Sequence, residues 1–435
     1  MDLKKELLQR FSFQNYTALQ EDAWQNTSNY QIVISPTGSG KTIAFVIRAL
    51  LHLQKHPDAK ILILTPTREL AIQINDVIKQ SRVEYSSLAV YGGNEFKREE
   101  NQLAEGVNLV IATPGRLLDH MERGALQEVE FDMLILDEYD KMLEIGFHNE
   151  LGQIVSYQEH WKKIILNSAT KIEEIPSFIN QYSFATNDYS KGNKPEIYKH
   201  LVMYEHEDKL EALRNVVLLH PEKKKIIFTT HRERAEMVYK YFHLLEFPCS
   251  LFHGGMDQRE RERELIKFEH GSTTIMICTD LGARGIDIDD IEEVIHYQLP
   301  IHNDSLKNNA DTHRNGRTGR MNKSGDVYYL LDDSKGIPDF LQGIEIIQEE
   351  ATEAEIFAPY STMYLPMGKK QKIRKMDVVG FFCKTGGISN KELGKITLKD
   401  NFTYVSVLSS HASKVKDKVD NQKIKNKKVR VSWCR

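Results

Sequence analysis

Three carboxylates stand close together after a short apolar run near residue 135. The run "MLIL" is followed at once by Asp137 and Glu138, and Asp140 comes two positions later. Acidic residues often end a strand in a solvated turn, which is one interpretation of this cluster. The other is a site in which one carboxylate holds a divalent cation and its neighbour activates a water molecule.

A second segment, "SPTGSGKT", carries the residue types that bind a phosphate chain. Gly38 and Gly40 would let the backbone direct its N–H groups at an anion, which the positive end of the following helix also attracts. Lys41 would reach the β and γ phosphates, and the hydroxyl of Thr42 would ligate Mg²⁺. The signature usually opens with glycine, and here Ser35 stands in that place. The segment predicts a nucleotide-binding loop.

This loop decides between the two interpretations of the acidic cluster. A phosphate-binding loop works with a second strand, whose tip directs an aspartate at the magnesium ion beside a residue that orients the attacking water. Asp137 is therefore predicted to hold the ion, and Glu138 to act as the base.

Phosphoryl transfer also needs positive charge beside the γ phosphate. The segment "HRNGRTGR" contains three arginines at a spacing of three, with two glycines among them. Arg317 and Arg320 are predicted to face the triphosphate, and an exposed basic loop is the alternative. Because these arginines belong to a later domain, they would reach ATP only when two domains close.

Short apolar runs that end in polar turns are expected to position these residues. The first two hundred residues contain six such runs: "QIVIS", "AKILIL", "LAVY", "NLVIA", "MLIL" and "KIILN". Their alternation with helix-like segments predicts a parallel sheet covered on both faces, with ligands beyond the carboxyl ends of the strands. A second series, including "KKKIIFTT" and "TTIMICTD", predicts another domain of the same α/β design. We expect domains at 1–203, 204–356 and 360–435, with an acidic, helix-rich connector over 344–356.

The composition is that of a globular protein without disulfide bonds. Hydrophobic residues make up 40% and charged residues 28% of the chain, which is typical of globular domains. The four cysteines form no CxxC pair, which argues against structural zinc and fits a reducing cytosol. No apolar run approaches the roughly 18 residues of a membrane helix, and the first ten residues lack the apolar segment of a secretion signal. We expect a cytoplasmic protein with no membrane contact.

The net charge of −4 hides a marked asymmetry. Residues 367–435 hold 18 Lys and Arg against 5 Asp and Glu, a net of +13, whereas residues 1–366 hold 40 against 57, a net of −17. A basic unit on an acidic body indicates a polyanionic partner for the C-terminal part. A solvated lysine-rich tail is the alternative.

Taken in order, these motifs resemble those of the DEAD-box ATP-dependent RNA helicases. "FQNYTALQ" resembles the family's adenine-reading motif, "PTREL", the Gly92–Gly93 pair and "TPGR" its RNA-backbone contacts, and "SAT" the motif that couples hydrolysis to unwinding. "HGGMDQRER", "CTDLGARGID" and "HRNGRTGR" resemble motifs of the family's second domain. The resemblance implies an α/β fold of two tandem RecA-like parallel-sheet domains that use ATP and Mg²⁺ and act on RNA.

The resemblance also assigns roles to individual residues. The catalytic set is Asp137, Glu138, Arg317 and Arg320, and Thr42 and Asp137 hold the metal. ATP binding falls to Phe13, Thr17, Gln20, Ser35, Pro36, Thr37, Gly38, Ser39, Gly40, Lys41, Thr42 and Asp287. Coupling falls to Asp140, Ser168, Thr170 and His313. RNA binding falls to Pro66, Thr67, Arg68, Gly93, Thr113, Gly115, Arg116, His253, Gly254, Arg261, Thr279 and Arg284, whose hydroxyl, N–H and guanidinium groups suit phosphates rather than base edges.

Three positions depart from the family pattern. Tyr139 stands where the family usually has alanine, and its bulk could alter the link between the acidic cluster and the "SAT" motif. Tyr16 replaces a usual proline. Asn315 replaces an apolar residue between the arginines, for which we expect a small effect.

The basic C-terminal unit resembles the RNA-binding domain of DbpA-type bacterial helicases, a small α+β RRM-like fold. The resemblance rests on "IRKMDVVGF", "GKI" and "FTYVSV". Phe402 and Tyr404 either stack bases, as RRM aromatics do, or are core strand residues. Salt-sensitive phosphate contacts are expected from the lysines at 414, 416, 418, 423, 425, 427 and 428. In that subfamily the module delivers the helicase to a hairpin of large-subunit ribosomal RNA.

The sequence therefore predicts a monomeric, ATP-dependent RNA helicase that unwinds short duplexes locally and is targeted to structured 23S-type rRNA during ribosome assembly. Two alternatives stay open. One is a general cold-stress or RNA-decay helicase that uses the basic unit for overall affinity. The other is an ATP-gated RNA clamp without productive unwinding, which Tyr139 motivates.

Overall fold

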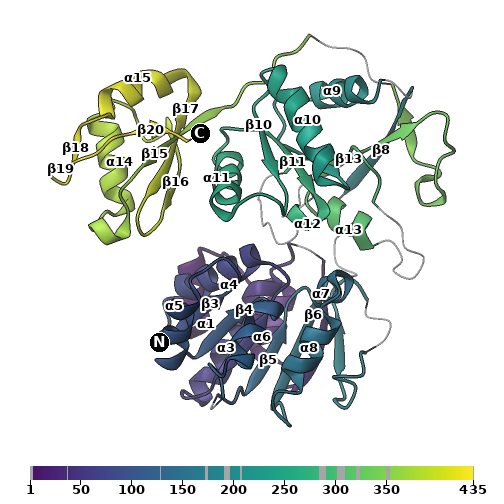
Figure 1. The fold of residues 1–435 in the computed structure, drawn as a ribbon, viewed down its shortest axis with the longest axis vertical. Coiled ribbons are helices and arrows are strands. Elements are labelled where there is room, and N and C mark those ends of the chain that lie inside the picture. The colour runs from purple at the N-terminus through teal and green to yellow at the C-terminus, as the bar shows by residue number, and fades with distance from the viewer. Residues whose placement is uncertain are drawn as a thin grey trace.

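The computed structural model consists of three units, each built on its own sheet (Figure 1). Within the described residues no helix has the length and apolarity that crossing a membrane requires. The structure describes residues 3–36, 38–127, 129–171, 175–190, 196–205, 208–283, 291–300, 309–319, 324–348 and 353–434.

The first unit is a seven-stranded parallel sheet with helices on both faces. In spatial order its strands are β3 (Ser87–Val90), β4 (Leu109–Ala112), β2 (Ile61–Leu64), β5 (Met133–Leu136), β6 (Lys163–Ser168), β1 (Tyr30–Ile34) and β7 (Ala185–Asp188). Its helices are α1 (Leu3–Phe11), α2 (Ala18–Gln25), α3 (Lys41–Lys55), α4 (Arg68–Gln80), α5 (Phe96–Ala104), α6 (Pro114–Glu122), α7 (Tyr139–Ile145) and α8 (His148–Val155).

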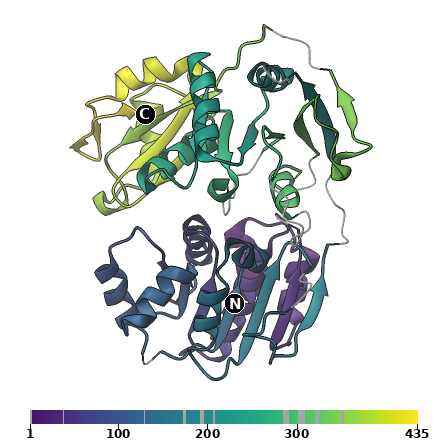
Figure 2. The same ribbon diagram turned by 45° about the vertical axis from the view of Figure 1, so that its right-hand side comes forward.

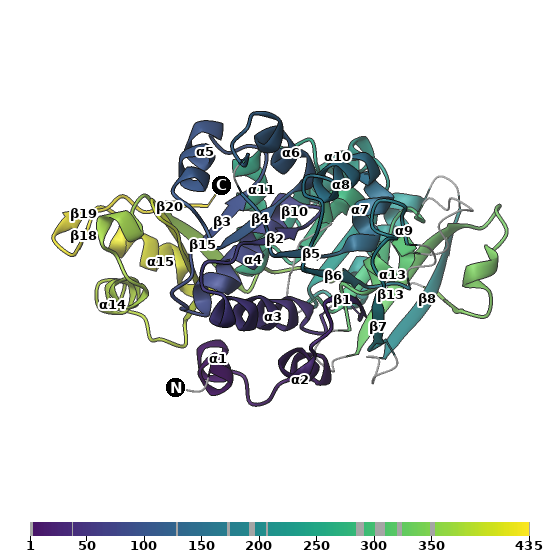
Figure 3. The ribbon, with the colours of Figure 1, turned by 90° about the horizontal axis from the view of Figure 1, so that it is seen from below.

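Both faces of this sheet are buried, which explains its uninterrupted apolar strands. In β2, Leu62 and Leu64 enter one core while Ile61 and Ile63 enter the other. Helices α3 and α4 cover one face, and α6 and α8 cover the opposite face (Figure 3). Successive side chains of a strand point to opposite faces of the sheet. Because both faces are buried, every position is apolar, and the strands show continuous apolar runs rather than alternating polar and apolar residues.

The second unit repeats this design. In spatial order its strands are β10 (Cys249–Phe252), β11 (Ile275–Thr279), β9 (Lys225–Thr229), β12 (Glu293–His296), β13 (Gly325–Asp332), β8 (Ile197–Tyr204) and β14 (Glu345–Ile347). Its helices are α9 (Lys209–Leu219), α10 (Arg232–Leu244), α11 (Gln258–Glu269), α12 (Asp280–Ala283), α13 (Asn309–Asn315) and the 3₁₀ turn η1 (Asp339–Leu341).

At two places the described residues of this unit differ from what the sequence led us to expect. Strand β8 pairs in parallel with β13 along its whole length, so the second sheet begins at residue 197 rather than at 204. The expected helical connector instead supplies β14, which pairs with β8 at the sheet edge. Its β-branched residues favour a strand once an open edge is near, and local periodicity carries no information about that edge.

The third unit is a four-stranded antiparallel sheet with two helices packed on one face. Its sheet order is β16 (Leu393–Leu398), β17 (Thr403–Leu408), β15 (Tyr360–Leu365) and β20 (Ser432–Trp433). The other elements are η2 (Lys369–Gln371), α14 (Lys375–Lys384), α15 (Ser409–Val419) and the hairpin of β18 (Lys423–Ile424) and β19 (Lys427–Lys428). The predicted small α+β RRM-like domain is confirmed.

The third unit touches the second at specific side chains. The third unit lies against α11 of the second in both Figure 1 and Figure 2. Lys399 Nζ lies 3.0 Å from Glu262 Oε1, and His270 Nε2 lies 2.8 Å from Thr397 Oγ1. These contacts seat the outer face of the small sheet on the second unit.

Candidate functional site

The polar loops of the first unit meet at one edge because hydrogen bonds extend the sheet beyond its strands. Ser35 N–H donates to the carbonyl of Ser168 (3.0 Å), and Asp137 N–H donates to the carbonyl of Leu64 (2.9 Å). The phosphate loop, the acidic cluster and the "SAT" segment therefore lie side by side, as expected for the carboxyl edge of a parallel sheet.

The phosphate loop has a conformation that suits an anion. Gly38 and Gly40 have φ values of 79° and 87°, which side-chain-bearing residues rarely adopt. Lys41 Nζ donates to the carbonyls of Ser35 (2.5 Å) and Pro36 (2.8 Å), which holds the ammonium over the loop. Helix α3 begins at Lys41, so its positive end faces the same space. Thr37 lies outside the described residues.

The segment that is predicted to read adenine contacts this loop directly. Thr17 caps α2 and exchanges hydrogen bonds with Gln20 in a capping box. Gln20 Nε2 then donates to the carbonyl of Gly40 (3.3 Å), and a Cβ at Gly40 would lie 2.3 Å from that nitrogen. Only glycine fits there. Phe13 is 37% exposed and stacks on Phe11 with the ring centroids 5.6 Å apart.

Asp137 is a buried carboxylate with too little positive charge around it. Burial, followed by repulsion from Glu138, raises its pKa to about 7 even though Lys41 opposes the shift. A divalent cation would supply the missing charge, and the Asp137 carboxylate with the Thr42 hydroxyl forms the hard oxygen donor set that Mg²⁺ prefers. The residues present fit that ion.

Glu138 sits in a different environment from its neighbour. Burial acts to raise its pKa, but the positive charges of Lys141 and Arg317 outweigh burial and leave the pKa below its ordinary value. Lys141 Nζ lies 3.2 Å from Glu138 Oε1. Glu138 Oε2 has no hydrogen-bond partner within the described part of the chain. A charged carboxylate with one uncommitted oxygen can orient a water molecule.

Asp140 connects the acidic cluster to the "SAT" segment and to the second unit. Its Oδ2 accepts hydrogen bonds from the N–H and the hydroxyl of Thr170 (3.1 and 2.8 Å). Ser168 Oγ donates to the carbonyl of Thr170 (2.6 Å). His313 Nε2, from α13, lies 3.7 Å from the same Asp140 oxygen. All four residues predicted for coupling are brought together.

The arginines of the second unit divide into two kinds. Arg314 is fully buried and forms a bidentate pair with Asp280 (2.5 and 2.6 Å), so its role lies within the second unit. Arg317 is near enough for its charge to lower the pKa of Glu138 in the first unit. Arg320 and Asp287 lie outside the described residues.

Asn315 is part of a buried hydrogen-bond network, although we expected its replacement of an apolar residue to have a small effect. Its amide accepts from His296 Nε2 (2.8 Å) and donates to Asp311 Oδ2 and Tyr329 Oη (2.9 Å each). Tyr329 in turn donates to Asp311 Oδ1 (2.8 Å). The network ties α13 to β12 and β13, which the expectation of a small effect did not foresee.

The residues of the first unit that are predicted to bind RNA follow the ends of β2, β3 and β4. The guanidinium of Arg68 lies against the paired glycines, since a Cβ at Gly93 would be 3.1 Å from its Nη1. Thr67 caps α4 by accepting from Leu70 N–H (3.3 Å), and Pro66 before it is buried. Thr113 and exposed Gly115 open α6 at the next strand tip.

Two predicted RNA ligands are already engaged with protein groups. Arg116 Nε donates to Glu99 Oε2 (2.9 Å), and its side chain is 15% exposed. Arg261 Nη2 lies 2.9 Å from Glu69 Oε1, an ion pair that joins the second unit to the first. Sequence reasoning could not foresee either pairing, because Glu99 lies outside every motif and nothing in the "PTREL" segment that holds Glu69 indicates a partner in the second unit.

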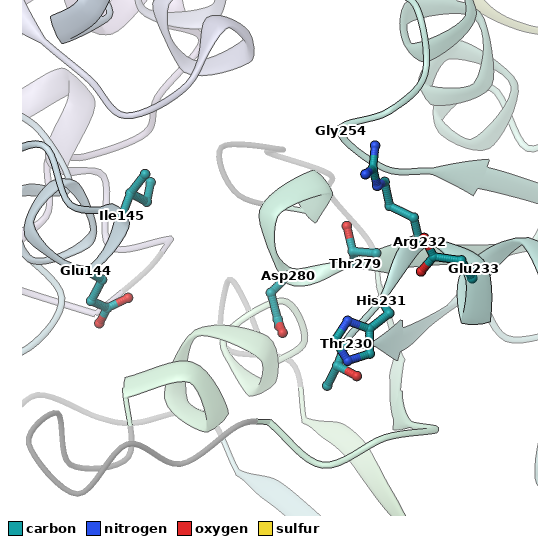
Figure 4. A pocket seen from close by; sticks show the side chains of 9 residues that line it. All are labelled: Glu144, Ile145, Thr230, His231, Arg232, Glu233, Gly254, Thr279 and Asp280. Carbon is teal, nitrogen blue, oxygen red and sulfur yellow. The ribbon is translucent and has the colours of Figure 1, made fainter.

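A cavity of about 760 Å³ lies between the two larger units (Figure 4). Glu144 and Ile145 line it from the first unit, and predicted residues Gly254 and Thr279 line it from the second. Predicted residue His253 is buried, with Nε2 3.4 Å from Glu236. Arg284 lies outside the described residues.

The cavity wall also contains Thr230, His231 and Arg232, which sequence analysis missed. They follow β9, so the rule that polar residues after a parallel strand face the ligand could have found them. A Cβ at Gly255 would lie 2.8 Å from Arg232 Nη1, which shows how closely this arginine approaches the neighbouring loop.

Of the two aromatics considered for base stacking, Tyr404 lies within an interface. It is 8% exposed and packs near Tyr364 and Phe402, with ring centroids 5.5 and 5.4 Å away. Burial raises its pKa, and the charges of Glu262 and Arg263 on α11 act on it. In this arrangement the second unit covers Tyr404, while Phe402 is half-buried.

Three family descriptions match the chain in order. "DEAD/DEAH box helicase" matches residues 17–178, "Helicase conserved C-terminal domain" 208–322, and "DbpA RNA binding domain" 362–432. The ATP-dependent RNA helicase DbpA of Bacillus subtilis (strain 168) is 31% identical, with 92% of this chain and 90% of the relative covered. The protein of the same name from Escherichia coli (strain K12) is 28% identical, with the same coverage.

Solved structures share the two-sheet core. Mss116p bound to ssRNA and AMP-PNP has 26% identity and a TM-score of 0.68, covering 77% of this chain and 73% of that chain. S. cerevisiae Dbp5 bound to RNA and ADP BeF3 has 23% identity and a TM-score of 0.67, covering 77% and 88%, and this likeness bears on the fold alone.

Proposed function

Because the chain belongs to the DEAD-box ATP-dependent RNA helicases and carries a DbpA RNA-binding domain, we propose a division of labour among its residues. The chain hydrolyses ATP when RNA and nucleotide draw the two larger units together. The observation that carries the proposal is the meeting of Asp140 with His313 across the two units at 3.7 Å.

In the proposed ATP site, the loop at 35–42 and Gln20 bind the nucleotide. Mg²⁺ held by Asp137 and Thr42 would neutralise charge on the phosphates. Glu138 removes a proton from the attacking water, and Arg317 and Arg320 from the second unit offset charge on the transferred phosphoryl group. Asp287 completes the set as a ribose contact.

In the proposed RNA path, a single strand crosses the predicted RNA-binding residues of the first unit and the cavity beneath the second. Arg68, Gly93 and the start of α6 would contact the backbone on one side, and Thr230, Arg232 and Thr279 on the other. Such contacts reach phosphate and sugar and leave the bases unread. Bending one strand over two closing units would separate a short duplex locally.

The finer proposal is that the third unit delivers this core to structured 23S-type rRNA in ribosome assembly. The support is the DbpA match and the net charge of +13 over residues 367–435. The four free cysteines and the bacterial relatives support a cytoplasmic location, and a monomeric state is part of the proposal.

A competition assay tests the target. An unlabelled large-subunit rRNA hairpin should displace labelled RNA at a much lower concentration than random RNA of equal length. Equal competition would favour the general cold-stress or RNA-decay helicase instead. Deleting residues 360–435 should remove the preference and leave basal ATP hydrolysis intact, whereas a preference that survives deletion would contradict the proposal.

The clamp alternative was based on Tyr139, whose bulk was expected to disturb the link between the acidic cluster and the "SAT" segment. This side chain is fully buried in the core of the first unit, and the neighbouring Asp140 still contacts both Thr170 and His313. We therefore favour productive unwinding. Normal ATP hydrolysis without separation of a short duplex would restore the clamp.

A further inference from the structure

A buried carboxylate lies behind the predicted RNA-binding residues of the first unit. Glu99, on α5, is 2% exposed although its helix lies at the surface. It belongs to none of the motifs described above. Buried carboxylates of this kind persist only where several donors satisfy them.

The two oxygens of Glu99 serve two different loops. Oε1 accepts from the N–H of Tyr91 (3.3 Å) and from Asn94 Nδ2 (3.0 Å), the residues on either side of the paired glycines. Oε2 accepts from Arg116 Nε (2.9 Å) and lies 2.9 Å from His120 Nε2, both on α6. One side chain thus spans the glycine loop and the "TPGR" segment.

Arg116 completes the link between these loops. Its Nη2 donates to the carbonyl of Asn94 (3.0 Å), and its Nη1 lies 3.6 Å from Asp119. Two of the three guanidinium nitrogens therefore donate hydrogen bonds inside the protein, and the third lies beside a carboxylate. Phe96 closes the cluster by stacking on the ring of His120, with centroids 4.0 Å apart, while Arg116 lies 4.9 Å from its centre.

The electrostatic balance keeps the carboxylate charged. Burial acts to raise the pKa of Glu99, but hydrogen bonds from His120, Arg116 and Asn94 outweigh it and hold the pKa below its ordinary value. Because His120 is fully buried and the Arg116 side chain is only 15% exposed, removal of the charge leaves these two donors on α6 without their acceptor.

We propose that Glu99 is a positioning residue for RNA binding, which sets the glycine loop and the start of α6 at the spacing that two successive backbone phosphates require. Arg116 acts as a strut in this arrangement rather than as a phosphate ligand. The inference rests on the proposed function, since it concerns the same RNA path.

The direction in which Glu99→Gln changes RNA affinity distinguishes a positioning role from a purely electrostatic effect. Removing a negative charge near a polyanion should strengthen binding. If Glu99 positions the loops, Glu99→Gln should instead weaken RNA binding. An amide has one accepting oxygen and one donating nitrogen, so either the donors on α6 or those of the glycine loop meet a donor where they need an acceptor. We expect the Kd for single-stranded RNA to rise about tenfold.

The experiment measures RNA binding by fluorescence anisotropy and RNA-stimulated ATP hydrolysis in the full chain. Glu99→Gln should raise the KM for RNA about tenfold, while kcat at saturating RNA stays within about twofold. Glu100→Gln is the matched control, since it removes the same charge from the next position on α5, and no hydrogen bond or ion pair of its side chain occurs among the described residues. ATP affinity without RNA checks that the first unit remains folded.

Double substitution tests the strut. Arg116→Ala should weaken RNA binding. Adding Glu99→Gln to Arg116→Ala should weaken binding no further, because both substitutions break the same Glu99–Arg116 interaction. If the increases in Kd of the two single variants multiply in the double variant, Arg116 binds phosphate independently of Glu99, and its role as a strut is excluded. If Glu99→Gln binds RNA as tightly as Glu100→Gln or more tightly, the positioning role fails. If the wild-type chain shows no RNA-stimulated hydrolysis, the proposed function fails instead.

Discussion

Asp140 and His313 belong to different sheets, yet Asp140 Oδ2 lies 3.7 Å from His313 Nε2. The same aspartate oxygen accepts hydrogen bonds from Thr170, so one carboxylate connects the second unit with the "SAT" segment. Arg261 and Glu69 form a second contact between the units at 2.9 Å. The predicted site residues thus come from both sheets.

Replacing Glu138 by Gln should stop turnover while leaving ligands bound. The amide cannot accept the proton of the attacking water, so kcat should fall about 10²- to 10⁴-fold, the range expected for loss of a general base. Equilibrium binding of ATP and RNA should change less than about threefold. Glu122→Gln, an exposed change on α6, is the control. Turnover within a few-fold of wild type would exclude Glu138 as the base.

Replacing Tyr139 by phenylalanine should stabilise the first unit, whereas replacing it by alanine should destabilise the unit strongly. Its hydroxyl has no hydrogen-bond partner among the described residues and is fully buried, so Tyr139→Phe should stabilise the first unit by about 1 kcal/mol. Tyr139→Ala leaves a cavity that costs about 3–5 kcal/mol. Urea unfolding monitored in the first unit measures both. A destabilised Tyr139→Phe would mean that the hydroxyl has a bonding role.

Exchanging the charges of Arg261 and Glu69 should show whether their ion pair holds the units together. Arg261→Glu or Glu69→Arg alone places like charges together and should lower RNA-stimulated turnover about tenfold. The double exchange should recover most of that loss. If Arg261 instead grips a phosphate, the double variant will stay as impaired as Arg261→Glu.

Acidification should destabilise the second unit through His296. Burial, and then the charge of Arg314, lowers its pKa to about 4, while Asp311 and Asp280 oppose the shift. In the unfolded chain the histidine has an ordinary pKa near 6.5. Between the two pKa values, His296 is therefore protonated in the unfolded chain and neutral in the folded chain. Stability is therefore full above the unfolded pKa and is lost as the pH falls toward the folded value, by about 2 kcal/mol between pH 7 and pH 5.

Urea unfolding of the second unit at the two pH values checks this dependence. His296→Asn cannot titrate and should lose most of the difference between pH 7 and pH 5. An unchanged pH dependence in that variant would place the effect on other groups.

Local spacing predicted which residues lie at the working edge. The loop at 35–42, Asp137, Glu138 and the predicted RNA-binding residues of the first unit all follow apolar runs. Because parallel strands end at a common edge, the order of these runs along the chain is enough to infer that the residues lie close together. The acidic cluster and the phosphate loop are where that inference was strongest.

Other relationships depended on segments that carry no local signal. Tyr139 enters the core, Asn315 bonds with His296, Arg116 bonds with Glu99, and β8 joins the second sheet. In each case a side chain or strand meets a partner that is distant along the chain or outside any motif, and burial then decides its role.

The amino-acid sequence by itself determined the two α/β series, the chemistry at their strand tips and the basic character of the third unit. Only the tertiary structure decided which arginines are committed to carboxylates, and it alone placed His313 against Asp140. The physical reason is that backbone periodicity and turn chemistry act over a few residues, whereas ion pairing and burial depend on how whole sheets and helices pack.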